Sequence, residues 1–306
     1  MNNFFGIFSV FGASFAASTG GMFGKLASEY INTFDLVLIR FSSQFIIISV
    51  LCLVFSVYPH KESSKLQQIT RGVLGSCSFT LGLWGNSNME MSNGTILKFS
   101  GKLFTILMAK YYLKEKISKT KYIILFIGFL GVFCVAKPSF IFGHSIHKEY
   151  PLRSYAVIAT ITGALSHSIS TILTKTIVNK VHVLSLIWYF SAVSLVLVMP
   201  LQLFKSTPSA FVNLEYPTFM VLFYLSSQLL QNIGLKVIPA SIVTLIQISD
   251  TLFGVFYGVM IFKEKLDLMS KVGCLLVFSV SILLAIEKYL EKPKYKALDM
   301  YLSSVK

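Results

Sequence analysis

The tripeptide Lys-Glu-Lys occurs twice in this chain, and each copy precedes a long apolar run. The two stretches read "LKEKISKTKYIILFIGFLGVFCV" at 113–135 and "FKEKLDLMSKVGCLLVFSVSILL" at 262–284. A shift of 149 residues superposes the tripeptides and also a set of small and apolar residues: Ser78 on Ser227, Gly85 on Gly234, Ser92 on Ser241, Thr95 on Thr244, Ser100 on Ser249, Leu103 on Leu252 and Phe104 on Phe253. A shift of 150 places Ser18 on Ser168 and Lys25 on Lys175. The pattern predicts a chain made of two copies of one repeat.

Composition places the chain in a membrane. Only 13% of its 306 residues are charged and 54% are hydrophobic, whereas a soluble domain carries about 25% charged residues. Apolar runs long enough to form a membrane-spanning helix recur nearly end to end. We therefore expect an all-α membrane protein with ten transmembrane helices, at roughly 4–26, 34–57, 69–90, 94–113, 119–138, 152–177, 183–204, 217–236, 239–262 and 268–287.

The number of spans in each half predicts the topology. Five spans are an odd number, so the two copies insert in opposite senses and form two inverted five-helix repeats, a design typical of carriers that work by alternating access. The expected organisation is a first repeat at 1–138, a connecting loop at 139–151, a second repeat at 152–287 and a tail at 288–306.

The distribution of basic residues predicts the orientation. Ten spans put both termini on one side, and the loops on that side hold most of the Lys and Arg, with "KEKISKTK" at 114–121 as the largest cluster. Because cytoplasmic loops are enriched in Lys and Arg, we expect both termini and the tail to be cytosolic. Lys263, Lys265 and Lys271 fall on the opposite side and are exceptions.

Two lysines stand within the fourth span, in "TILKFSGKLF" at 95–104. Lys98 and Lys102 are four residues apart and share one helical face. A rise of 1.5 Å per residue puts Lys102 roughly 12 Å deep and Lys98 about 6 Å deep. A charge at the bilayer centre costs about 2.5–3.5 kcal/mol, so it normally faces protein or water. Either both lysines face a central cavity and bind a negative group, or Lys98 snorkels to the interface and Lys102 forms a structural ion pair.

Asp250 is the one acidic residue deep in a predicted span, ~16 Å from the cytosolic end of the ninth. In the repeat, Gln247 matches Lys98 and Thr251 matches Lys102. A Lys102–Asp250 pair is compatible with the two depths. Asp250 is open to three interpretations: a structural ion pair, a substrate or proton site, or a solvated cavity wall.

Four further polar or aromatic residues are candidates for a cavity wall. Arg40 suits a bidentate contact with a carboxylate or phosphate, or else pairs with Asp35 or a headgroup. His167 is a ligand, a proton relay or a hydrogen-bonded packing residue. Trp84 in the third span and Gln228 in the eighth line a polar cavity or mediate helix packing.

The motifs around the tripeptides resemble a known transporter family. "LKEK" at 113–116, "KPSFIFG" at 137–143 and "ASIVTLIQISDTLFGVF" at 240–256 resemble the drug/metabolite transporter superfamily, whose members contain two five-helix EamA domains, and within it the G branch of solute carrier family 35. The resemblance implies a carrier fold. Where relatives usually have a proline in the fourth helix this chain reads "SGKLF", with Lys102, and Lys98 replaces a commonly apolar residue. These departures leave the cargo open.

The expected function is secondary transport of a small organic anion, a metabolite, by alternating access. Arg40, Lys98 and Lys102 outnumber Asp250, which favours an anion over a polyamine. The alternatives are a carrier of a zwitterionic amino acid or nucleotide-sugar-like substrate, and a non-transporting membrane protein that regulates or binds other proteins. The expected partners are a small-molecule substrate and the bilayer, with a homodimer left open.

Other function classes lack sequence support. The chain carries no phosphate-binding loop, metal-ligand spacing or nucleophile motif. We therefore expect no enzyme activity, no cofactor and no metal. Despite a net charge of +14, the basic residues do not form an aromatic-basic module, which argues against nucleic acid.

Overall fold

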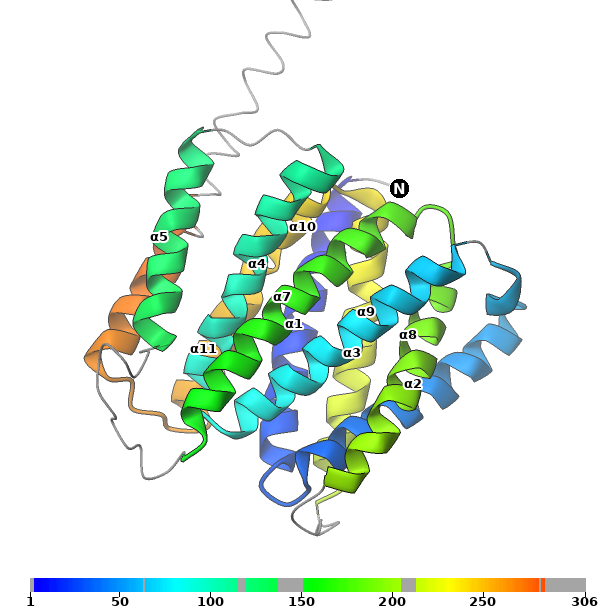
Figure 1. Ribbon diagram of the computed structural model, residues 1–306, viewed down its shortest axis with the longest axis horizontal. Helices are drawn as coiled ribbons and strands as arrows, with labels where there is room; N and C mark the ends of the chain where they lie inside the picture. The colour runs from blue at the N-terminus through cyan, green and yellow to red at the C-terminus, as the bar shows by residue number, and fades with distance from the viewer. Residues whose placement is uncertain are drawn as a thin grey trace, which may run out of the picture.

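The computed structural model describes residues 3–62, 64–114, 119–136, 151–204, 213–280 and 282–283. Within these ranges every regular element is a helix (Figure 1). The α-helices are α1 Asn3–Ala27, α2 Thr33–Val54, α3 Lys65–Ser87, α4 Met91–Leu113, α5 Lys119–Ala136, α7 Arg153–Ile177, α8 Val183–Val198, α9 Glu215–Val237, α10 Ala240–Ile246, α11 Ile248–Met260 and a last helix, Leu268–Val280. Short 3-10 helices occupy Pro59–Lys61 and Met199–Phe204.

These helices correspond to the ten predicted spans, with α10 and α11 sharing the ninth. Four segments are long and apolar enough to cross a membrane by length and composition: Phe4–Ala27, Thr33–Val54, Arg153–Ile177 and Ala240–Met260. Helix α4 falls outside this group although it is 23 residues long, because it carries polar side chains such as Lys98 and Lys102. The predicted tail and most of the loop at 139–151 lie outside the described residues.

The two halves of the chain are interleaved. Helix α1 packs along α9, and α3 packs along α7, so each pair joins one helix from each half. Figure 1 shows α5 and the orange last helix at one edge of the bundle and α2 with α8 towards the other. Helix α4 contacts α5 on one side and α7, α10 and α11 on others. Helices from both halves therefore surround the middle of the bundle.

The ninth span is broken, which the sequence did not predict. Helix α10 ends at Ile246, Gln247 forms a single turn residue, and α11 begins at Ile248. The Gln247 N–H still donates to the Val243 carbonyl at 2.9 Å, and the Asp250 N–H donates to the Gln247 carbonyl at 3.1 Å. The break puts Asp250 in the first turn of α11, where the helix dipole stabilises a negative charge.

Candidate functional site

A cavity of about 240 Å³ lies between the helices. Its wall takes side chains from α1, α2, α3, α4, α7, α8, α9 and α11, so both halves contribute. Seven of the residues singled out in the sequence meet there: Arg40, Lys98, Lys102, His167, Gln228, Gln247 and Asp250.

Lys102 and Asp250 form an ion pair in the cavity wall. The Lys102 Nζ donates to Asp250 Oδ1 and to Thr251 Oγ1, the latter at 2.7 Å. Thr251 Oγ1 in turn donates to the same Asp250 Oδ1 at 3.1 Å. The Lys102 side chain is 10% exposed and that of Asp250 29%. No described residue donates to Asp250 Oδ2, so the pair leaves one carboxylate oxygen open.

Lys98, one turn before Lys102, also lines the cavity. Its side chain is half-buried, and its stem packs against Gly82 of α3. Among the described residues it makes no hydrogen bond and no ion pair. An ammonium group that lines a cavity without a hydrogen-bond acceptor has all three donors available for a ligand.

Arg40 is almost fully buried, at 3% exposed, in a box of aromatic rings. Its guanidinium carbon lies 3.6 Å from the ring centroid of Phe79 and 4.8 Å from that of Tyr224, with Phe41 and Phe190 further out. Cation–π contacts stabilise the charge there. Its Nε and Nη1 atoms are buried and donate to no described residue, so the rings hold the guanidinium but leave donors unused.

Arg71 is a cavity residue that the sequence analysis missed. Its Nε donates to Thr174 Oγ1 at 2.5 Å, its Nη1 to the Leu186 carbonyl at 2.8 Å and its Nη2 to Asn232 Oδ1 at 3.3 Å. Each of its nitrogens therefore has a protein acceptor, which uses three of its five N–H donors. The sequence signal was a lining stripe at helical spacing through α3: Arg71, Gly75, Ser78 and Gly82.

The remaining candidates differ in position. His167 is exposed at the cavity, and its ring makes no hydrogen bond with a described residue, so its role as a ligand, a proton relay or a packing residue stays open. Gln228 accepts from Gln44 Nε2 at 2.7 Å and so links α9 to α2. Thr251 is fully buried behind the ion pair. Trp84 lies outside the cavity wall and packs against the buried cluster that contains Phe99.

The cavity is strongly electropositive. Among the described residues, Arg40, Arg71, Lys98 and Lys102 line it with Asp250 as the single acidic side chain, an excess of three positive charges. A cleft lined by one sign of charge concentrates ligands of the opposite sign. The arrangement favours a negatively charged group in the cavity.

Comparison with known proteins decides the family. A model of the "EamA-like transporter family" matches the chain twice, at residues 4–137 and 154–286. The chain belongs to the EamA-like transporter family. It is thus a multi-pass integral membrane transporter of the drug/metabolite superfamily, near the G branch of solute carrier family 35.

Several relatives of this EamA chain are transporters by name. It is 23% identical over 297 residues to human "Solute carrier family 35 member G1", covering 94% of this chain and 81% of that protein. It is 27% identical over 191 residues to an "S-adenosylmethionine uptake transporter" of Rickettsia bellii, covering 60% of each. A solved crystal structure superposes with a TM-score of 0.66 at 12% identity, covering 94% of this chain and 98% of that one. At that identity the likeness concerns the fold alone.

Proposed function

We propose that the chain is a secondary transporter that carries a small organic anion through the central cavity by alternating access. The observation that carries this proposal is the excess of three positive charges in the cavity wall. Of the four cations, Lys102 is paired with Asp250 and Arg71 is occupied by protein acceptors. Lys98 has no acceptor among the described residues, and a carboxylate or phosphate would satisfy its donors, while the buried guanidinium of Arg40 adds positive charge nearby.

An inverted repeat would supply the two alternating states. In Figure 1, α1 and α7, the first helices of the two halves, run in opposite directions, as such a repeat requires. Repeat-related lysines also make related bonds. Lys25 donates to the Met89 carbonyl at 2.8 Å. Its repeat mate Lys175 donates at 2.8 Å to the carbonyl of Ile238, which lies 149 residues after Met89 in the chain. With the repeats at 1–138 and 152–287, both termini would be cytosolic.

A zwitterion is a second candidate cargo, and Asp250 favours it. The Asp250 side chain is 29% exposed and keeps Oδ2 free of any described donor. An amino-acid group could place its carboxylate at Lys98 and its ammonium at Asp250. The Rickettsia relatives named for S-adenosylmethionine uptake make this cargo class worth testing, since that molecule carries such a group.

Uptake into proteoliposomes tests the proposal. Purified protein would be offered radiolabelled succinate, inorganic phosphate, S-adenosylmethionine, spermidine and glucose, each at matched concentration. We expect saturable uptake of an anion or of the zwitterion, with liposomes that contain the Lys98→Met variant as the matched control. Uptake confined to spermidine or glucose would contradict the charge argument.

A further inference from the structure

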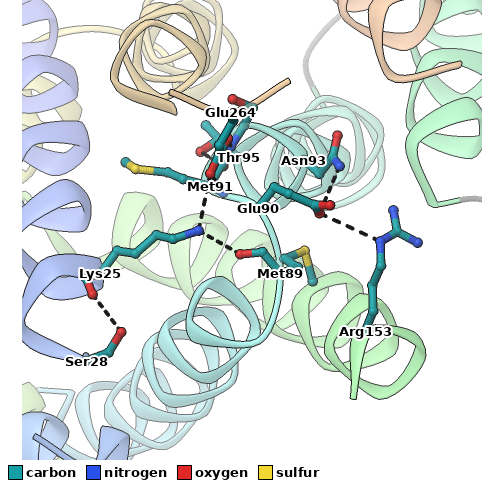
Figure 2. Close-up of polar contacts among 10 residues, drawn as sticks. Lys25, Ser28, Met89, Glu90, Met91, Asn93, Thr95, Arg153 and Glu264 are labelled. Atoms are coloured by element: carbon teal, nitrogen blue, oxygen red, sulfur yellow. Dashed lines mark hydrogen bonds and ion pairs between the residues drawn. The ribbon is translucent and has the colours of Figure 1, made fainter. Parts of the chain in front are cut away.

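A second lysine–carboxylate pair lies beside the cavity but outside the proposed substrate site (Figure 2). Lys25, in the last turn of α1, is 7% exposed. Its Nζ donates to the Met89 carbonyl at 2.8 Å and to Glu264 Oε1 at 3.2 Å. The Glu264 side chain is 8% exposed. This pair therefore connects α1 to the segment that follows α11.

Glu264 also binds the start of α4. Its Oε1 accepts from the Met91 N–H at 2.5 Å and its Oε2 from the Ser92 N–H at 2.9 Å. These are the first two residues of the helix, whose N–H groups have no partner within it. Glu90 precedes them but makes no capping bond with its side chain. Glu264 thus caps α4 from the other half of the chain.

This network borders one end of the cavity. Met91, whose N–H binds Glu264, lines the cavity, as does Gly21, one turn before Lys25. Helix α11 packs closely against the same residues at Gly258. A Cβ atom added there would lie only 2.0 Å from Ser92 Oγ and 2.6 Å from Glu264 Oε2. The ends of α1, α4 and α11 meet there around one carboxylate.

Helix α7 is tied to the same place by polar contacts. The Nε atom of Arg153, the first residue of α7, lies 3.7 Å from Glu90 Oε2. The same oxygen accepts a hydrogen bond from Asn93 Nδ2 at 3.0 Å. Figure 2 shows both contacts next to the Lys25–Glu264 pair. This end of the cavity therefore brings together residues from four helices that line the cavity: α1, α4, α7 and α11.

We propose that Lys25, Glu264 and the N-terminus of α4 form a gate that is shut in this structure and opens to admit or release cargo at that end. The inference rests on the proposed transport function. The repeat supplies its counterpart: Lys175 donates to the Ile238 carbonyl at 2.8 Å and to that of Leu235 at 2.6 Å. Glu115, which matches Glu264 in sequence, lies outside the described residues.

Cysteine accessibility tests the gate without any knowledge of the cargo. Ala17, a cavity-lining residue of α1, would be changed to cysteine in a Cys77→Ser background, since Cys77 is the exposed native cysteine among the described residues. The full chain in liposomes is then labelled with a membrane-impermeant maleimide from the gate side. The variants are Glu264→Gln and Lys25→Met. Glu29→Gln is the matched control, because Glu29 is an exposed carboxylate near the same end of α1.

We expect both gate variants to raise the labelling rate at least tenfold and Glu29→Gln to leave it within twofold. An unchanged rate in a folded Glu264→Gln or Lys25→Met protein would overturn the gate. If one variant fails to fold, the other carries the test. Since labelling needs no cargo, increased labelling in a protein that transports none of the uptake probes would support the gate while refuting the proposed function.

Discussion

Two lysine–carboxylate pairs connect the halves of the chain within the part that the structure describes, and they differ in how many protein donors the carboxylate accepts from. Glu264 accepts from Lys25, the Met91 N–H and the Ser92 N–H through both oxygens. Asp250 accepts from Lys102 and Thr251 through Oδ1 alone. The side chains of the first pair are 9% and 8% exposed, and those of the second 10% and 29%.

This difference separates a pair that holds the helices around it together from a pair that is open to a ligand. A carboxylate whose lone pairs are filled by protein donors stabilises the closed arrangement of the helices around it. A carboxylate with an open oxygen, next to an unpartnered lysine, can exchange protein contacts for contacts with a ligand. Breaking a buried pair by removing one partner is costly because the remaining charge loses its compensation. The cost should therefore be larger at the gate than in the cavity.

The largest expected effect is that of Glu264→Ala. It removes the ion pair between Glu264 and the buried Lys25 and both bonds to the start of α4. We expect a loss of about 3–5 kcal/mol in folding free energy. Asp250→Ala should cost less, because water in the cavity can solvate Lys102 and Thr251 still accepts from it. Thermal unfolding of the two purified variants measures how far each lowers the melting temperature. If Asp250→Ala lowers it as much as or more than Glu264→Ala, the distinction between the two pairs is contradicted.

The next effect concerns Gly258→Ala. The added methyl would overlap Ser92 Oγ and lie 3.0 Å from the backbone nitrogen of Ser92, so the helices must separate at the gate. Overpacking of this kind costs about 1–3 kcal/mol. Gly12→Ala is the matched control, because the nearest atom to its new Cβ is 3.4 Å away, an ordinary contact. We expect the melting temperature to fall for Gly258→Ala and not for Gly12→Ala. Equal melting temperatures of the two variants would show that the contact between α11 and α4 accommodates a side chain at position 258.

The Lys98→Met substitution should lower anion uptake without lowering thermal stability. Because Lys98 has no described partner, its removal should leave the melting temperature unchanged or raise it. Uptake of the anion should fall at least tenfold, equivalent to about 1.4 kcal/mol. Lys102→Met should lower both, since it strips Asp250 of its counter-charge. A melting temperature that falls as far for Lys98→Met as for Lys102→Met would mean that Lys98 is structural.

The smallest expected effect is that of Thr251→Val. The substitution keeps the shape of a fully buried side chain and removes its bonds to Lys102 and Asp250. One net hydrogen bond is worth about 0.5–1.5 kcal/mol, so a modest loss of thermal stability is expected. Uptake should keep its KM within threefold, because Thr251 lies behind the pair. A tenfold rise in KM would place this hydroxyl in contact with the cargo.

The sequence predicted the helices because apolar runs recur along the chain, although only four of the described segments are long and apolar enough to cross a membrane by length and composition. It missed the break at Gln247, since no glycine or proline marks it in "TLIQISD" at 244–250. Lys98, Lys102 and Asp250 stood out because charges are rare in such runs. Arg71 escaped notice near the start of a span, where a basic residue is usually an interfacial anchor.

The aromatic residues around Arg40 could not be predicted from the sequence either. Tyr224 and Phe79 surround Arg40, but aromatic residues are common in membrane helices and carry no signal by themselves. The partners of Glu264 were invisible for another reason. They are backbone N–H groups of Met91 and Ser92, more than 170 residues away in the chain, and only the fold brings them together.

Equilibrium binding of one acid and its amide tests the cationic cavity most directly. The anion selected by the uptake panel and its primary amide would be titrated against the wild-type protein and against Lys98→Met. We predict that the amide binds the wild type at least tenfold more weakly, about 1.4 kcal/mol, and that this difference shrinks below threefold in Lys98→Met. Equal affinity of acid and amide for the wild type, or the same ratio in both proteins, would contradict recognition of negative charge by Lys98.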